Sequence, residues 1–111
     1  MTRVLVAKSA CMGIGDDELG AKLIKAFFLK LVASETKPDT IVFYNTGVKL
    51  VCEGSEVLDS LELLAQAGVD LPACGTCLAH FHLTDKLKVG RRSNMQEIVG
   101  LLTKAEQVVT I

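Results

Sequence analysis

The stretch Val4-Leu-Val-Ala7, together with the segment Lys8-Ser-Ala-Cys-Met-Gly-Ile-Gly15 that follows it, decides the fold of this chain. Short, wholly apolar runs with β-branched residues are typical of strands buried on both faces of a parallel sheet. The following segment is rich in small residues and contains two glycines, so it predicts a loop. Asp16 can then cap a helix, in which apolar residues recur at spacings of three and four up to about Ser34. The predicted unit is a strand, a loop and a helix.

The same unit repeats along the rest of the chain. Further strands are predicted at 40–44, 69–74, 87–89 and 107–111. Helices are predicted from a cap at Ser55 to Gly68, over 75–83, and from the capping box Ser93-Asn-Met-Gln96 through Leu102. Residues 48–53 fit either a helical turn or a strand. The alternation predicts an α/β fold, a three-layer sandwich with a mainly parallel sheet of about five strands.

A parallel sheet gathers its strand-to-helix loops at the carboxyl edge, where open α/β folds bind ligands. The predicted loops are 8–15, 45–47 and 74–76. If the strand order is 2-1-3, as in flavodoxin-like folds, the loops after the first and third strands open onto one crevice. We expect the following residues to line it beside Cys74 and Cys77: Cys11, Gly13, Gly15, Asn45, Thr46, Gly75 and Thr76.

Composition excludes several classes of protein. With 13 acidic and 12 basic side chains among 111 residues, the net charge is −1, which provides no concentrated positive field for a nucleic acid or an anionic membrane. The length suits a single domain, 1–111, and half of the residues are hydrophobic, so a core can form without disulfides. No apolar run is long enough for a signal peptide or a membrane span. We therefore expect a cytoplasmic protein with reduced cysteines.

Cys74-Gly-Thr-Cys77 is the strongest chemical signal in the sequence. Cys74 ends a predicted strand and Cys77 enters a predicted helix, whose N-terminus favours the thiolate, the nucleophilic form of cysteine. The pattern indicates redox or sulfur chemistry. Two alternatives remain open: the thiols are packed as small apolar groups, or Cys74, Cys77, His80 and His82 bind zinc. Zinc sites, however, usually take two ligands from each of two separate segments.

The other candidate motifs are weaker. Cys52 follows two apolar residues and is expected to be packed, and His80 is either a modulator of the thiols or a surface residue. The glycines at 13, 15 and 20 do not match a dinucleotide loop, and the acidic residues at 16–18 would repel phosphate, so no nucleotide cofactor is expected. Thioredoxin-like sites place a cis-proline beside their cysteine pair. No proline follows Pro72 in this chain, so a thioredoxin-like site is disfavoured.

Several motifs lie in a specific order along nearly the whole chain: Met12-Gly-Ile-Gly-Asp-Asp-Glu-Leu-Gly20, Phe43-Tyr-Asn-Thr-Gly-Val-Lys-Leu50, Glu53-Gly-Ser55, Cys74-Gly-Thr-Cys-Leu78, and Lys86-Leu-Lys-Val-Gly90 with Ser93-Asn-Met95. Together they resemble the DsrE/DsrF-like sulfur-relay family, and within it the DsrE-like domain of YedF-type selenium-metabolism proteins. The resemblance implies a flavodoxin-like fold, homo- or hetero-oligomers, and a cysteine at the end of the third strand that carries sulfur as a persulfide from a donor protein to an acceptor. Cys74 matches that cysteine, and Cys77 matches the second cysteine of the YedF-type pattern.

YedF-type proteins usually carry an N-terminal TusA-like domain as well, and nothing in this sequence matches it. We therefore expect either a stand-alone version or one domain of a longer protein, with a TusA-like protein as a candidate partner.

The sequence thus predicts a sulfur carrier, with selenium as an alternative cargo, that holds its cargo on Cys74 and uses Cys77 as an assisting or resolving thiol. No metal or other cofactor is expected. The expected partners are sulfur donor and acceptor proteins and further copies of the chain. The alternatives are a dithiol redox protein, and a non-enzymatic scaffold or regulatory module that binds its ligand at the carboxyl-edge crevice.

Overall fold

The computed structural model describes residues 2–111, which form a five-stranded sheet with helices on both of its faces. The strands are β1 (Arg3–Ala7), β2 (Thr40–Phe43), β3 (Pro72–Cys74), β4 (Arg91–Ser93) and β5 (Gln107–Thr110). The helices are α1 (Asp17–Ala33), α2 (Leu58–Gln66), α3 (Gly75–His80) and α4 (Met95–Lys104), with two 3₁₀ helices, η1 (Asn45–Val51) and η2 (Thr84–Lys86). No helix in this part of the chain is both long enough and apolar enough to cross a membrane.

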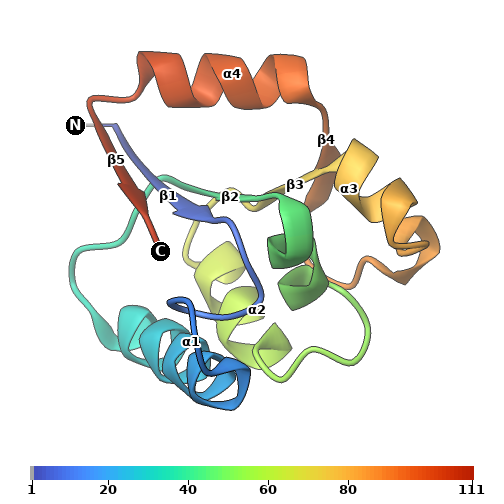
Figure 1. Cartoon of the computed structure of the whole chain (residues 1–111). Coiled ribbons are helices and arrows are strands. Elements are labelled where there is room, and N and C mark those ends of the chain that lie inside the picture. Colours follow the sequence, from blue (N-terminus) through green and yellow to red (C-terminus); the bar gives the residue numbers. More distant parts are fainter. Residues whose placement is uncertain (1) are drawn as a thin grey trace.

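All strand pairs in the sheet are parallel, and the strand order is β4-β3-β2-β1-β5. The chain steps in one direction from β1 to β4, and α4 then carries it back to the far side of β1. Right-handed crossovers place the helices of the forward steps on one face and the helix of the return step on the other. Figure 1 shows this division, with α1 and α2 below the sheet and α4 above it. The predicted three-layer α/β sandwich is confirmed.

The strand order 2-1-3 is wrong. β2 lies between β1 and β3: it pairs with β1 along Thr40–Phe43 and with β3 through Phe43 and Ala73. Strand order depends on which distant segments pair, and local hydrophobic periodicity does not contain that information. The change matters for the site, because the loops after β1 and β3 are separated by the loop after β2.

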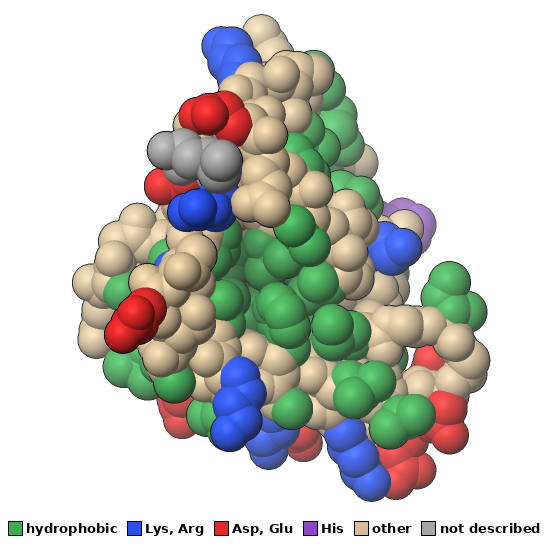
Figure 2. Space-filling view, turned by 90° about the vertical axis from the view of Figure 1, so that its left-hand side faces the viewer, with side chains coloured by type: hydrophobic (Ala, Val, Ile, Leu, Met, Phe, Trp, Pro, Cys, Tyr) green, Lys and Arg blue, Asp and Glu red, His purple; other side chains and the backbone are tan. Residues whose placement is uncertain are grey.

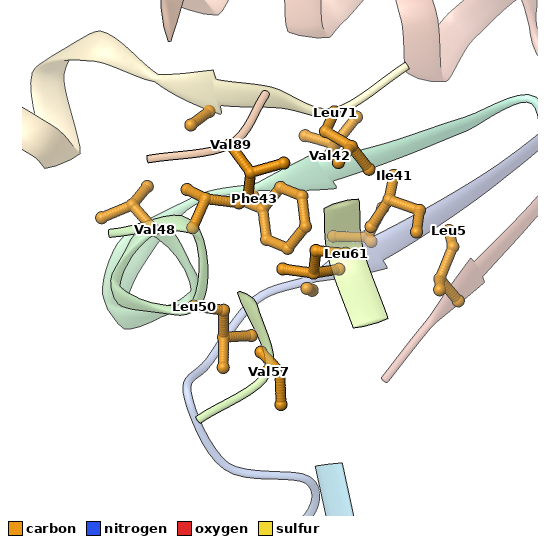
Figure 3. Packing of buried hydrophobic residues seen from close by; sticks show 14 of the residues in the cluster. Leu5, Ile41, Val42, Phe43, Val48, Leu50, Val57, Leu61, Leu71 and Val89 are labelled. Carbon is orange, nitrogen blue, oxygen red and sulfur yellow. The ribbon is translucent and has the colours of Figure 1, made fainter. Parts of the chain in front are cut away.

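The core is aliphatic with a few phenylalanines. Ile41 and Phe43 of β2 point toward Leu61 of α2 (Figure 3), and Phe28 of α1 is fully buried with them. On the other face, Ile98 is the buried residue of α4. Burying one such side chain is worth roughly 1.5–3 kcal/mol, so these contacts hold both helix layers on the sheet.

Several predicted boundaries are wrong by a few residues, among them the fourth strand and the cap of α4. The fourth strand lies at Arg91–Ser93 rather than at 87–89, since Gly90 turns the chain with φ +78° and Arg91 N then donates to the Leu71 carbonyl at 3.1 Å. The cap of α4 is Asn94, not Ser93: the Asn94 side chain accepts from Glu97 N at 2.8 Å. Ser93 belongs to β4.

At the other helix ends, the predictions for Asp16 and Gly68 are confirmed and the prediction for Ser55 is wrong. Asp16 caps α1 by accepting from Leu19 N at 3.0 Å, and Gly68 follows α2 with φ +98°. Ser55 does not cap α2 itself but accepts from Val57 N, two residues on, at 3.2 Å. The segment 48–53 had fitted either a helical turn or a strand, and its first residues form the end of the 3₁₀ helix η1.

Candidate functional site

The loops after β1 and β2 are joined at the carboxyl edge of the sheet. Gly47 in η1 lies against the end of β1 so closely that a Cβ there would be 2.0 Å from the carbonyl oxygen of Ala7. Beside it, Thr46 Oγ1 accepts from Ala10 N at 3.2 Å and lies 3.4 Å from Ser9 Oγ. Only glycine permits this approach, so η1 fills the space in which a crevice between the first and third strands was expected.

Asn45 connects this edge to the cysteine pair. Its backbone has φ +52°, a left-handed conformation that asparagine tolerates better than most residues. Its side-chain oxygen accepts from Thr46 N at 2.8 Å, and its own N–H donates to Cys77 Sγ at 3.1 Å. The sequence placed Asn45 and Thr46 at the pocket without a role. In the structure they orient a backbone donor toward a thiol.

The two cysteines of the pair differ in exposure. Cys74 ends β3, opposite Ser93 of β4, and is 1% exposed, whereas Cys77 lies in the first turn of α3 and is only partly buried. Gly75 between them packs against β4, because a Cβ there would be 2.8 Å from the Ser93 carbonyl oxygen. Thr76 is exposed. Both cysteines are free thiols, and Cys77 is the one a partner can reach.

Burial raises the pKa of the Cys77 thiol above its ordinary value. The Asn45 N–H lowers that pKa, while a hydrogen bond with Cys74 and its charge raise it further. The thiolate that the helix N-terminus was expected to favour is therefore not the dominant form of Cys77 at neutral pH, since α3 is only six residues long and cannot offset the desolvation. Cys77 becomes a nucleophile as the pH rises.

Cys11 does not share a cleft with the pair. It lines a separate cleft of about 420 Å³ together with Lys8, Ser9, Gly13, Ile14 and Ile111. Its Sγ donates to the carbonyl of Asp17 at 3.5 Å. Gly13 and Gly15 are exposed turn residues with φ +87° and +132°. The strand order that put Cys11 and the Cys74–Cys77 pair at one crevice is wrong, because β2 lies between β1 and β3.

Cys52 is packed, as predicted: it is 1% exposed, its Sγ donates to the Val48 carbonyl at 3.1 Å, and burial raises its pKa. His80 and His82 are exposed, and the His80 ring meets the edge of Phe81 with centroids 5.1 Å apart. Across residues 2–111, no group of three or more His, Cys, Asp or Glu side chains is placed to hold a metal ion. The zinc alternative therefore finds no support in the geometry.

Sequence reasoning missed two features of the site. Gly47 was predicted only as part of the loop 45–47, although a glycine so soon after a strand was the available signal for a tight backbone contact. The second feature is Lys49, whose Nζ lies 4.8 Å from the centre of the Phe81 ring. Lys49 follows Asn45 by four residues, and Phe81 follows Cys77 by four residues. The Lys49–Phe81 contact therefore lies next to the Asn45–Cys77 contact, further along both segments.

Comparisons with known proteins agree with this fold. The family model described as DsrE/DsrF-like family matches residues 20–111, whereas the chain matches none of the curated proteins with which it was compared. Among solved structures it is similar to MTH1491 of Methanobacterium thermoautotrophicum, a protein described as of unknown function, with 24% identity, TM-score 0.70 and 100% of both chains covered. It is also similar to the ychN protein of E. coli (19% identity, TM-score 0.68, 100% of both chains). A third similar structure is BT1422 of Bacteroides thetaiotaomicron (14% identity, TM-score 0.63, 98% of this chain and 94% of that one).

Proposed function

The chain belongs to the DsrE/DsrF-like family, whose members often act in sulfur relay, and from that premise we propose that it carries sulfur on the Cys74–Cys77 pair. Cys74 is the carrier, and Cys77 is the assisting or resolving thiol. The observation that supports this best is the Asn45 N–H, which donates at 3.1 Å to the Sγ of Cys77, three residues after the buried Cys74. A backbone donor at that position stabilises negative charge on sulfur, in a thiolate or in a persulfide.

The proposed transfer begins at Cys77, because Cys74 is only 1% exposed. The Cys77 thiolate attacks the outer sulfur of a donor persulfide, and the donor leaves as a thiolate. Cys74 then attacks the same outer sulfur and releases Cys77. Delivery reverses these steps: Cys77 takes the sulfur back, and an acceptor thiolate removes it from Cys77. Alternatively, Cys77 attacks the Cys74 Sγ and expels hydrosulfide, which leaves a disulfide that a dithiol reductant must reopen.

The proposed partners are a donor and an acceptor protein, with a TusA-like protein as a candidate for either. We place the relay in the cytoplasm, where all four free cysteines stay reduced. Selenium is an alternative cargo, since a donor that holds thiol-bound selenium as S–SeH can pass the selenium atom to a cysteine by the same exchange and leave as a thiolate.

Intact mass spectrometry after incubation with glutathione persulfide tests the proposal. The reference chain is Cys11→Ser with Cys52→Ala, which keeps only the pair. We expect one added sulfur atom on this chain, and peptide mapping should find it on Cys74. In Cys74→Ser the adduct can remain only on the more exposed Cys77, so an added thiol should remove it faster, and Cys77→Ser should load more slowly. No added sulfur on the reference chain, or an adduct on Cys74→Ser that resists the added thiol as well as the adduct on the reference chain, would refute the carrier role. A disulfide that forms without release of hydrosulfide would favour the dithiol redox alternative.

We also propose that copies of the chain associate through β5. A parallel sheet is normally covered on both faces, yet Val108 and Val109, which point to opposite faces, are 43% and 47% exposed. Figure 2 shows the resulting apolar surface, between α4 at the top and α1 at the bottom. A groove beside β5 is lined by Phe27, Leu31 and Val109. β5 itself carries no charged residue that would protect an edge strand from pairing.

Light scattering during gel filtration tests this association. Val109→Lys should shift the chain to the monomer, whereas the control Val99→Lys, on the exposed side of α4 at 52% exposure, should not. A wild-type chain that remains monomeric at high concentration would refute the proposal.

A further inference from the structure

A second cavity lies outside the cysteine pair, and the proposed sulfur chemistry does not use it. Its volume is about 450 Å³, within the range of small-molecule sites. It is bounded by α1, by the segment between η1 and α2, and by the end of α3. Its wall is apolar and is formed by Ile24, Leu50, Cys52, Val57, Phe81 and Leu83. Leu50 and Val57 are seen in Figure 3 at the end of the core away from the sheet.

Charged side chains stand only at the rim of this cavity, and they are unequally paired. Glu56 lies 3.9 Å from Lys25, and Glu53 lies 3.4 Å from Lys86, so both rim carboxylates have a cationic partner. Lys49 has no carboxylate within ion-pair distance among residues 2–111, and its Nζ rests over the Phe81 ring at 4.8 Å. The rim therefore presents one uncompensated positive charge next to an apolar wall.

The sulfur atom in the wall is not a reactive group. Cys52 is 1% exposed, its Sγ donates to the Val48 carbonyl at 3.1 Å, and burial keeps the thiol protonated at neutral pH. A ligand in the cavity meets Cys52 as an apolar surface, so binding there is non-covalent.

We infer that this cavity binds a small amphiphilic anion, with its apolar body against Ile24, Leu50 and Phe81 and its anionic group at the Lys49 ammonium. An apolar cavity selects an apolar body, and the single unpaired cation selects one negative charge. Phe81 is the residue directly after α3 and follows Cys77 by four residues, so the bound anion lies about one helical turn from the cysteine pair. The inference goes beyond sulfur transfer and does not depend on it.

Two fluorescent probes with nearly the same apolar body test both parts of the inference. 8-Anilinonaphthalene-1-sulfonate carries one negative charge, and N-phenyl-1-naphthylamine carries none. Both should bind the wild-type chain one to one. Lys49→Met should weaken the anionic probe roughly fivefold and change the neutral probe by less than about twofold. The matched control Lys88→Met, which removes an exposed lysine outside the cavity, should change neither.

Ala21→Trp locates the site, because Ala21 is an exposed residue of α1 that lines the cavity, and a large side chain there fills the space without disturbing the core. Both probes should then lose about tenfold or more in affinity. The inference is overturned if neither probe binds the wild type, if Ala21→Trp leaves binding unchanged, or if Lys49→Met affects both probes equally. Binding that appears only after an oligomer is diluted to monomers also overturns it, because a second copy would then occupy the cavity.

Discussion

Replacing Gly47 by alanine should damage both the fold and the site. The added Cβ would be 2.0 Å from the Ala7 carbonyl oxygen, 3.0 Å from its carbon and 3.3 Å from Ser9 N. All three are backbone atoms. Ala7 is fully buried at the end of β1, which is paired on one side with β2 and on the other with β5, so it cannot move far. The 3₁₀ helix η1 must move instead.

The size of the effect follows from that geometry. Real Cβ atoms essentially never come closer than 3.0 Å to another heavy atom, so η1 must shift by roughly 1 Å. Overpacking a rigid site of this kind costs about 3 kcal/mol, a large share of the 5–15 kcal/mol that typically stabilises a domain. With a urea m-value of roughly 1.5 kcal/mol/M, the midpoint of unfolding should fall by about 2 M.

Two other glycines provide matched controls. Gly54 has φ +93° with nothing within 4 Å, so Gly54→Ala carries only the backbone cost of about 1 kcal/mol. Gly100 lies inside α4, also with nothing within 4 Å, so Gly100→Ala should stabilise the chain by roughly 0.5–1 kcal/mol. Urea unfolding of the three variants should thus rank Gly47→Ala lowest and Gly100→Ala above wild type. A midpoint for Gly47→Ala within about 0.5 M of wild type would refute the steric argument.

Three further predictions concern the thiol, a helix cap and acid stability. Asn45→Asp keeps the acceptor for Thr46 N but adds a negative charge beside Cys77, so the pKa of Cys77 should rise further. Alkylation of Cys77 by iodoacetamide at pH 7 should then slow roughly threefold. The control Asn45→Gly keeps the donating N–H and should not slow the alkylation. Asn94→Ala should destabilise the chain by about 1 kcal/mol in thermal unfolding, whereas Gln96→Ala, at the exposed end of the capping box inferred from the sequence, should change stability by less than about 0.5 kcal/mol. Hydrogen bonds from Arg91 and then from Ser93 lower the pKa of Glu97. The Glu97 carboxylate therefore contributes stability above its ordinary pKa of 4.5, and this contribution is lost as the pH falls through the lower, folded-state value. The difference in stability between wild type and Glu97→Gln should close in acid, and a difference that stays constant down to pH 2 would contradict this assignment.

The elements of the fold could be predicted because local signals agreed with one another. The apolar run at Val4–Ala7 and the cap at Asp16 are signals that lie within a few residues of sequence, and the strand and the helix that they predicted both formed. The fourth strand was misplaced because the apolar segment at 87–89 has the composition of a strand, whereas Arg91 forms the pairing that the structure contains. Arg91 is held in β4 by two ion pairs, with Asp70 at 2.8 Å and with Glu97 at 2.7 Å, and hydrophobic periodicity reveals neither of them.

The site could be predicted less completely, for a related reason. The Cys74–Cys77 spacing identified the pair, since the strand end and helix start are local properties. The position of Cys11 relative to that pair depended on the strand order, which is a property of the whole sheet. Because β2 lies between β1 and β3, the loop that carries Cys11 does not follow a strand adjacent to the one that ends at Cys74.

The strand order also explains which group lowers the pKa of Cys77. Because β2 lies next to β3, η1 starts beside α3, and the donor that reaches Cys77 Sγ is the backbone N–H of Asn45 rather than a side chain. A backbone donor cannot be removed by truncating a side chain. The position of the Asn45 N–H is instead set two residues later in the chain, where Gly47 packs against Ala7. The acidity of Cys77 therefore depends on the contact between η1 and β1. A shift of η1 by about 1 Å would lengthen the N–H···S hydrogen bond beyond useful range, so Gly47→Ala should also slow the alkylation of Cys77 in molecules that remain folded.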